Sequence, residues 1–341
     1  MDKKRPDLTL SGLVKWSGRG SFPDFRTTAT GVLQANNVRN ARLTTIGSSL
    51  ALQGIQPAAV LRILKNLPGV EWLALGKSTE PDTRSVNRTL ASIAKNYLTK
   101  GSTFRVVAEV PGDKSKESDL AGAAASLLLD EFRGVRIDEK HPKTTFRVVV
   151  DSSMAVAGVE VQRGVGGAPT SQLRRAHCLV SGGMHSSVVA WMAARSGHSV
   201  SLLHVFESDE SIRETAKIYA ELSQRMDPRA LKLQVLFPEE SSSVGRVLLA
   251  WLRSGRSRTT FSGAHSECGN ASFLAPTSVA RPLFLLSEED FEEIQRSLGL
   301  RGYSRTLGAL QSRNGSDKHF TERSFGGIRA DVHLVLDTLL S

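Results

Sequence analysis

The chain has 341 residues, 40% hydrophobic and 23% charged, a balance typical of two or three globular domains with buried cores. No apolar run is long enough to span a bilayer or to act as a secretory signal, which argues against a membrane or secreted protein. The formal charge of +10 favours a polyanionic partner, and two cysteines, Cys178 and Cys268, are too few for a disulfide framework. We therefore expect a cytoplasmic protein.

Residues 1–80 predict a small α+β unit. Its polar opening shows no clear period, but 43–52 has the pattern of a hairpin, and Pro57 opens a helix with apolar residues on one face. A strand is predicted over 70–75 and a linker over 77–83.

Residues 84–170 predict a second α+β unit, because apolar residues alternate between helical and strand spacing. The expected elements are helices 86–98 and 119–132, strands 103–110, 144–150 and 154–162, and a loop at 163–169.

Residues 174–341 predict an α/β domain with a parallel, doubly wound sheet, because short strands alternate with helices. The expected strands are 178–180, 200–206, 231–237 and 259–262, and the expected helices are 186–195, 209–226, 243–253 and 288–298. Ligands of such sheets bind at the carboxyl ends of the strands.

A strand–glycine–helix segment in this third block predicts an anion site. Glycines allow a close backbone approach, and the first N–H groups of the helix point into the loop. The alternative is a plain turn with Ser186 as N-cap. The candidate nucleotide-binding residues are Ser181, Gly182, Gly183, Met184, His185, Ser186 and Ser187 in this segment, with Phe206, Gly263 and His265 at the ends of neighbouring strands.

This segment, 181–186, resembles the Ser-Gly-Gly-x-Asp-Ser PP-loop of the ATP pyrophosphatases. The helix that follows it, the segment 261–266 and the Arg-Pro-Leu at 281–283 are similar to the 4-thiouridine synthetase branch of that family. Upstream, residues 84–170 resemble a THUMP domain, with its strand at 103–106 and its closing glycine loop at 165–169. Residues 41–75 resemble the ferredoxin-like domain that precedes THUMP.

The resemblance implies three domains: ferredoxin-like at 1–80, THUMP at 84–170, and a PP-loop domain of the adenine nucleotide alpha hydrolase type at 174–341. It implies an enzyme that uses ATP and Mg2+ to adenylate a tRNA base and then inserts sulfur, giving 4-thiouridine. The implied partners are the acceptor end of tRNA and a sulfur-donor protein, and a homo-oligomer is left open.

Two departures bear on catalysis. His185 stands where the family has aspartate, and magnesium prefers oxygen ligands. Residues 300–341 contain no cysteine, so Cys268 is the candidate nucleophile, against the simpler reading of a small loop residue. No metal site is predicted. The alternatives are a catalytically inactive tRNA-binding adaptor and another RNA-adenylating enzyme on the same scaffold.

RNA binding requires cations on one side of the THUMP-like unit, because phosphate contacts dominate affinity. Each candidate is otherwise an ordinary solvated charge. The candidate RNA-binding residues are Arg105, Lys114, Lys116, Lys140, Lys143, Arg147, Arg163, Arg174 and Arg175, with Gly166 and Gly167 allowing close approach to the backbone.

Overall fold

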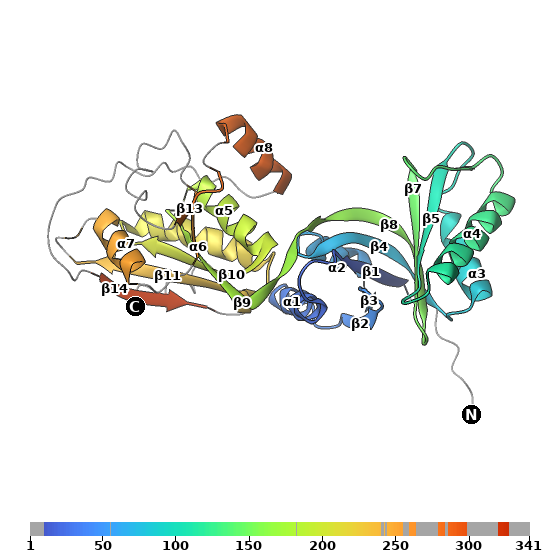
Figure 1. The fold of residues 1–341 in the computed structure, drawn as a ribbon, viewed down its shortest axis with the longest axis horizontal. Coiled ribbons are helices and arrows are strands. Elements are labelled where there is room, and N and C mark those ends of the chain that lie inside the picture. The colour runs from blue at the N-terminus through green and yellow to red at the C-terminus, as the bar shows by residue number, and fades with distance from the viewer. Residues whose placement is uncertain are drawn as a thin grey trace, which may run out of the picture. The chain divides into compact units, whose positions relative to one another are not determined.

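The computed structural model describes residues 10–54, 56–181, 183–239, 242, 244–254, 259–263, 279–283, 286–298 and 320–326. The chain divides into two compact units, Met1–Gly167 and Ala168–Ser341, and each combines helices with one sheet (Figure 1). This confirms the predicted mixture of α+β and α/β structure. Within the described residues, no helix has the length and apolar character needed to cross a membrane.

The first unit contains eight strands and four helices in its described part. They are β1 (Leu10–Trp16), α1 (Phe22–Ala35), β2 (Arg42–Ile46), β3 (Ser49–Gln53), α2 (Pro57–Leu64), β4 (Val70–Thr79), α3 (Thr83–Ala94), β5 (Thr103–Glu109), α4 (Lys114–Glu131), β6 (Arg136–Ile137), β7 (Thr144–Val150) and β8 (Ala155–Gly166). The strands form a single sheet in the order β2-β3-β1-β4-β8-β7-β5-β6.

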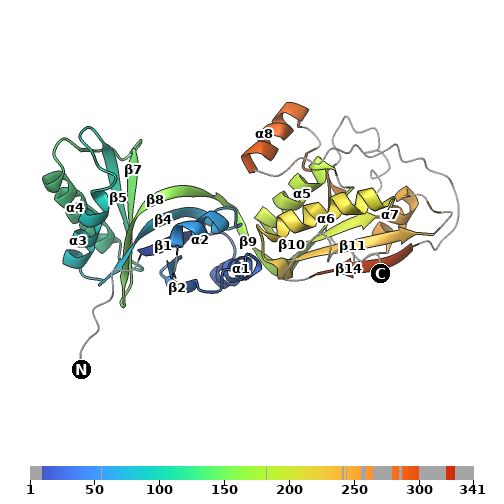
Figure 2. The same cartoon turned by 180° about the vertical axis from the view of Figure 1, so that it is seen from behind.

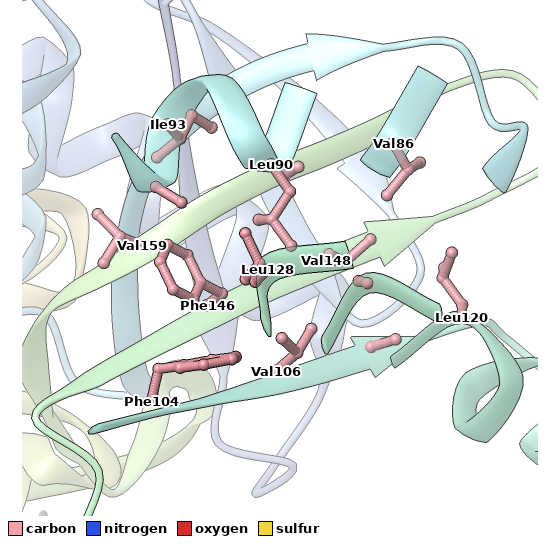
Figure 3. Close-up of a cluster of buried hydrophobic side chains, with 14 of the residues drawn as sticks. Val86, Leu90, Ile93, Phe104, Val106, Leu120, Leu128, Phe146, Val148 and Val159 are labelled. Carbon is pink, nitrogen blue, oxygen red and sulfur yellow. The ribbon is translucent and has the colours of Figure 1, made fainter. Parts of the chain in front are cut away.

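All four helices pack on one face of this sheet. Leu75 and Val159 lie directly opposite each other where β4 meets β8, so their side chains share a face. Leu75 packs against the core under α1 and α2, and Val159 belongs to the core under α3 and α4 (Figure 3). The predicted ferredoxin-like and THUMP segments therefore share one continuous sheet.

The opposite face curls on itself and encloses a smaller core. Leu13, Trp72, Val149 and Val156 belong to this cluster and come from four different strands. At the rim, Lys15 of β1 donates to Ser48 (2.6 Å) and forms an ion pair with Glu109 of β5. Three strands separate β1 from β5 in the sheet, so only strong curvature brings these side chains together.

Capping residues explain why two helices begin earlier than predicted. Asp82 accepts a hydrogen bond from the Ser85 N–H (2.9 Å), which starts α3 at Thr83 rather than at residue 86. Asp113 accepts from the Lys116 N–H (3.0 Å), which starts α4 at Lys114 rather than at residue 119.

The second unit alternates strands and helices as predicted (Figure 2). Its described elements are β9 (Ala168–Leu179), α5 (Met184–Arg195), β10 (Ser196–Val205), α6 (Asp209–Ser223), a 3-10 turn at Pro228–Ala230, β11 (Leu231–Pro238), α7 (Val244–Arg253), β12 (Thr260–Ser262), β13 (Val279–Ala280), α8 (Glu288–Leu298) and β14 (Phe320–Phe325). The sheet order is β13-β12-β9-β10-β11-β14.

This second sheet is doubly wound. Every described strand pair is parallel except β11–β14, which is antiparallel. Leu203 and Val205 of β10 pack with α7, whereas His204 between them contacts α6. Successive strand residues point to opposite faces, so α6 and α7 cover opposite faces of the sheet.

Long-range pairing corrects three predictions. The linker expected at 77–83 is wrong, because β4 continues to Thr79 by pairing with β8. The loop expected at 163–169 is largely strand, with positive φ at Gly166 and Gly167 between β8 and β9. The short strand expected at 178–180 ends the 12-residue β9, whose polar first half pairs with β10.

Candidate functional site

The described part of the second sheet reverses its strand order at β9. Strand β10 follows β9 in the chain and lies on one side of it, whereas the later β12 lies on the other side, with Ser262 opposite Leu179. The carboxyl ends of strands at such a reversal form the usual ligand crevice of an open α/β sheet. The glycine-rich loop after β9 and Gly263 after β12 both lie at this edge.

The loop leads directly into the N-terminus of α5. Gly183 is the N-cap residue, and glycine has no side chain with which to cap the first N–H groups of the helix. These groups and the positive end of the helix dipole favour an anion. Ser186 and Ser187, in the first turn, are buried, at 5% and 1% exposed.

The peptide group that enters the loop is held at both ends. The Val180 carbonyl accepts a hydrogen bond from His204 Nδ1 (3.0 Å), and the Ser181 N–H donates to Ser186 Oγ (3.3 Å). A carbonyl oxygen only accepts, so Nδ1 carries the proton in this arrangement. The orientation of this peptide is therefore set before any ligand arrives.

His204 also connects the loop to the next helix. Its Nε2 lies 3.2 Å from Ser211 Oγ, and Thr215 Oγ1 lies 3.3 Å from Nδ1, both on α6. Ser211 is part of the box that caps α6, with Ser208 as N-cap. This buried network gives His204 a structural role, because it connects the loop to the start of α6. The spacing of one histidine and two hydroxyl residues is too weak a signal to identify the network from sequence.

His185 lies in the first turn of α5 between two neighbours. Its imidazole stacks on the ring of Phe291 in α8, with centroids 4.0 Å apart and planes inclined by 29°. On its backbone side, a Cβ at Gly263 would lie 2.8 Å from the carbonyl carbon of His185, so only glycine fits there. The sequence pattern did not identify Phe291, because α8 lies more than a hundred residues from the loop.

The donor set of the loop does not fit a metal ion held by the protein. Its described residues offer hydroxyls, backbone groups and one imidazole, whereas magnesium is usually bound through one or two carboxylates. Across the described ranges, no group of three or more His, Cys, Asp or Glu side chains is arranged to hold a metal.

Phe206 lies apart from the loop, at the carboxyl end of β10. Its ring stacks on Phe237 at the end of β11, with centroids 5.1 Å apart. The guanidinium of Arg323 on β14 lies 5.3 Å from the centre of the Phe237 ring. These three side chains form an aromatic and cationic cluster on β10, β11 and β14.

Several predicted residues have no described site geometry. Gly182, His265 and Cys268 lie outside the described residues, and Met184 is described only as the first residue of α5. Cys178 is fully buried in β9, as expected of a core residue, and burial raises the pKa of its thiol. It is therefore unreactive.

The cations predicted for RNA binding separate into two groups in the first unit. Arg105 of β5 reaches the Glu139 carbonyl (3.2 Å), beside Lys140, and the Lys143 N–H donates to Thr103 Oγ1 (3.1 Å). Arg163 lies at the same end, because β8 runs antiparallel to β7 and passes beyond its start. We call Arg105, Lys140, Lys143 and Arg163 the basic end.

Lys114 and Lys116 lie past the opposite end of β5. The seven residues of β5 span roughly 20 Å from its first residue, Thr103, beside Lys143, to its opposite end. The hydrogen bond from the Lys116 N–H, followed by the contact with the Lys116 side chain (3.1 Å), lowers the pKa of the Asp113 carboxyl. Their distance from the basic end, and not the ion pair, makes them less suited to contact the same stretch of RNA backbone, because Arg163 of the basic end also pairs with a carboxylate, Glu160 (3.2 Å).

Arg147 was predicted to contact RNA at the surface, and this prediction is wrong because the side chain is buried. It is 8% exposed, donates to Glu160 Oε2 from Nε (3.0 Å) and Nη2 (2.6 Å), and lies 4.4 Å from the centre of the Trp72 ring. Its charge is balanced by the Glu160 carboxylate inside the curled sheet. Arg174 and Arg175 are exposed on β9 and so belong to the second unit.

No family model matches the chain. Curated relatives named probable tRNA sulfurtransferase, from Bacillus velezensis and Levilactobacillus brevis, are each 26% identical to it, over 161 and 180 residues. The matches cover 46% and 52% of this chain but 40% and 44% of the relatives. The matched segment thus spans less than half of these relatives.

Two solved structures have a similar fold. PH1313 from Pyrococcus horikoshii gives a TM-score of 0.64 at 18% identity, over 85% of this chain and all of that one. A 4-thiouridine synthetase in complex with RNA and bound ATP gives 0.61 at 16% identity, over 85% of each chain. Sequence and fold agree, and the resemblance expected from the motifs is confirmed.

Proposed function

We propose that this chain, similar to tRNA sulfurtransferases in sequence and to a 4-thiouridine synthetase in fold, binds tRNA and uses ATP to activate a base for thiolation. In this proposal the first unit holds the RNA and the second holds the nucleotide. The domain assignment within them is 1–80 ferredoxin-like, 84–170 THUMP and 174–341 PP-loop.

The observation that carries the proposal is the prearranged loop after β9. Its entering peptide is fixed by His204 and Ser186, and it opens onto the uncapped start of α5. Donors held in place before a ligand binds lower the cost of ordering them around phosphate. The alternative, a plain turn with Ser186 as N-cap, is not what forms here, because Gly183 occupies the N-cap position.

The proposal assigns the phosphates and the base of ATP to different groups of the second unit. The N–H groups at the start of α5 and the Ser186 and Ser187 hydroxyls would hold the phosphates, and the half-buried Phe206 would border the base. Adenylation would join AMP to the tRNA base and release pyrophosphate. A separate sulfur-donor protein would then supply sulfur and displace AMP.

The basic end would contact the phosphates of the tRNA acceptor region. Its four side chains come from β5, β8 and the loop before β7, and Lys140 and Lys143 are exposed. Exposed cations on one rim suit a backbone that is recognised by shape and charge.

The test is release of AMP and pyrophosphate from labelled ATP by the full chain, with and without bulk tRNA. Release that requires tRNA, and that at subsaturating ATP falls by about fivefold in Ser186→Ala, is the expected result. Filter retention of tRNA without any release would reject the enzyme and leave an RNA-binding adaptor. A matched control is Ser223→Ala, at the far end of α6, which leaves release unchanged.

A further inference from the structure

We propose that the loop after β9 binds the phosphates of ATP without a Mg2+ ion held by its own side chains, and that His185, fixed against Phe291, takes the place of a carboxylate in the loop. This inference rests on the proposed ATP binding and goes beyond it, because it concerns which charges balance the phosphates. Three observations support it.

The first observation is the chemistry of the loop side chains. From Ser181 to Ser187 the side chains are hydroxyls, hydrogen atoms of glycine, one thioether and one imidazole, and none is a carboxylate. An imidazole is neutral or cationic, so it adds no negative charge that would attract a divalent cation. Magnesium takes oxygen ligands and gives up its water reluctantly.

The second observation is that His185 is held in place. Its ring lies 4.0 Å from the ring of Phe291, which is 1% exposed, and its backbone touches Gly263. Contacts on both sides leave the first turn of α5 little freedom to rearrange around a metal. This packing suits an imidazole better than a carboxylate, because a carboxylate at this position would lose its hydrating water and lie against an apolar ring.

The third observation is that the loop already has donors for phosphate. The start of α5 has no side-chain cap and carries the positive end of the helix dipole, and the Ser186 hydroxyl lies at the loop, 3.3 Å from the Ser181 N–H. Phosphate charge is then balanced by groups that are part of the fold. Two acidic side chains near the loop, Glu207 and Asp209, are exposed beyond the end of β10. On α8, the neighbours of Phe291 are also exposed: Asp290 accepts a hydrogen bond from the Ser287 hydroxyl (2.7 Å), and Glu292 lies 3.8 Å from Arg296.

The experiment is calorimetric titration of ATP into the full chain, in excess EDTA and in millimolar MgCl2. For the unaltered chain, the two dissociation constants should agree within about threefold, because the loop contributes no metal ligand. A dissociation constant more than about tenfold weaker in EDTA than in MgCl2 would overturn the proposal while leaving ATP binding intact.

Two variants sharpen the result. His185→Asp places a negative charge beside the phosphates, so its affinity in EDTA should fall by about tenfold or more and should recover in MgCl2. His185→Asn adds no charge and should show no dependence on the metal. Far-ultraviolet circular dichroism checks that both variants fold, and the unaltered chain decides the question if either does not.

The two proposals fail in different ways. Absence of ATP binding in both buffers would reject the proposed function together with this inference. Binding only in MgCl2 would reject this inference alone.

Discussion

The two units offer different kinds of group to a polyanion. In the first unit the candidate contacts are side-chain cations on one rim, such as Lys140 and Lys143, which are exposed. In the second unit they are backbone N–H groups and buried hydroxyls, held by contacts such as that between His204 and Val180. Exposed charges are screened by salt, whereas prearranged dipoles in a buried loop are screened much less.

The buried polar groups near the candidate contacts also differ. In the first unit, Arg147 is buried and pairs with Glu160. In the second unit, His204 is buried beside the loop, among hydroxyls and a carbonyl. We therefore expect mutation of Arg147 to act mainly on stability, and mutation of the loop to act mainly on nucleotide affinity.

The largest effect is expected at Arg147. Arg147→Met should lower the free energy of unfolding of the first unit by about 3 kcal/mol, because Glu160 is left buried without its main partner. Urea unfolding followed by circular dichroism measures this. Arg163→Ala is the matched control, since Arg163 contacts the same carboxylate but its side chain is 68% exposed, and it should cost less than about 1 kcal/mol.

The Arg147→Met variant also distinguishes a structural role of Arg147 from a role in RNA binding. If Arg147→Met weakened tRNA retention at unchanged stability, Arg147 would be an RNA contact after all, as the sequence suggested. The double variant Arg147→Met with Glu160→Met should recover part of the lost stability, because no charge is then left unpaired.

The second largest effect is expected in the salt dependence of binding, which should differ between the two units. If the four cations of the basic end contact phosphates, tRNA affinity should fall by roughly 50-fold between about 50 and 200 mM salt, through release of counterions. ATP affinity should change far less over the same range. Filter binding measures the tRNA affinity, and calorimetry measures the ATP affinity. Equal salt sensitivity of the two affinities would contradict this difference between the units.

Gly263→Ala should weaken ATP binding by about tenfold, because the added Cβ would lie 2.8 Å from the backbone of His185 and must displace the start of α5. Calorimetry measures the affinity. Gly245→Ala is the control, since a Cβ there meets nothing within 4 Å. Retention of tRNA should be the same in both variants, and a loss in Gly263→Ala would mean that the damage is not local.

The smallest of these effects is expected for Ser186→Ala. Removal of the hydroxyl leaves the Ser181 N–H without its acceptor and should weaken ATP binding by about fivefold, close to 1 kcal/mol. Ser186→Thr keeps the hydroxyl and should bind more tightly than the alanine variant. Equal affinity of the two variants would mean that the hydroxyl does not hold the loop.

Local patterns in the sequence were sufficient for most elements. The alternation of Thr103–Glu109 predicts a strand with one buried face, and it forms β5 with alternating burial. The glycines between an apolar strand and a helix predict the loop after β9. These features depend on neighbouring residues, whose preferences are written within a few positions of the chain.

Contacts between distant residues decided the rest. Pairing with β8 extended β4 through the expected linker, and pairing with β10 turned a polar segment into the first half of β9. Arg147 became an interior residue because Trp72 and Glu160 fold over it, and His185 acquired a stacking partner from α8. The sequence by itself thus determined the elements and the loop chemistry. Only the tertiary structure decided which charges are buried and which groups surround the loop, because burial depends on packing between segments far apart in the chain.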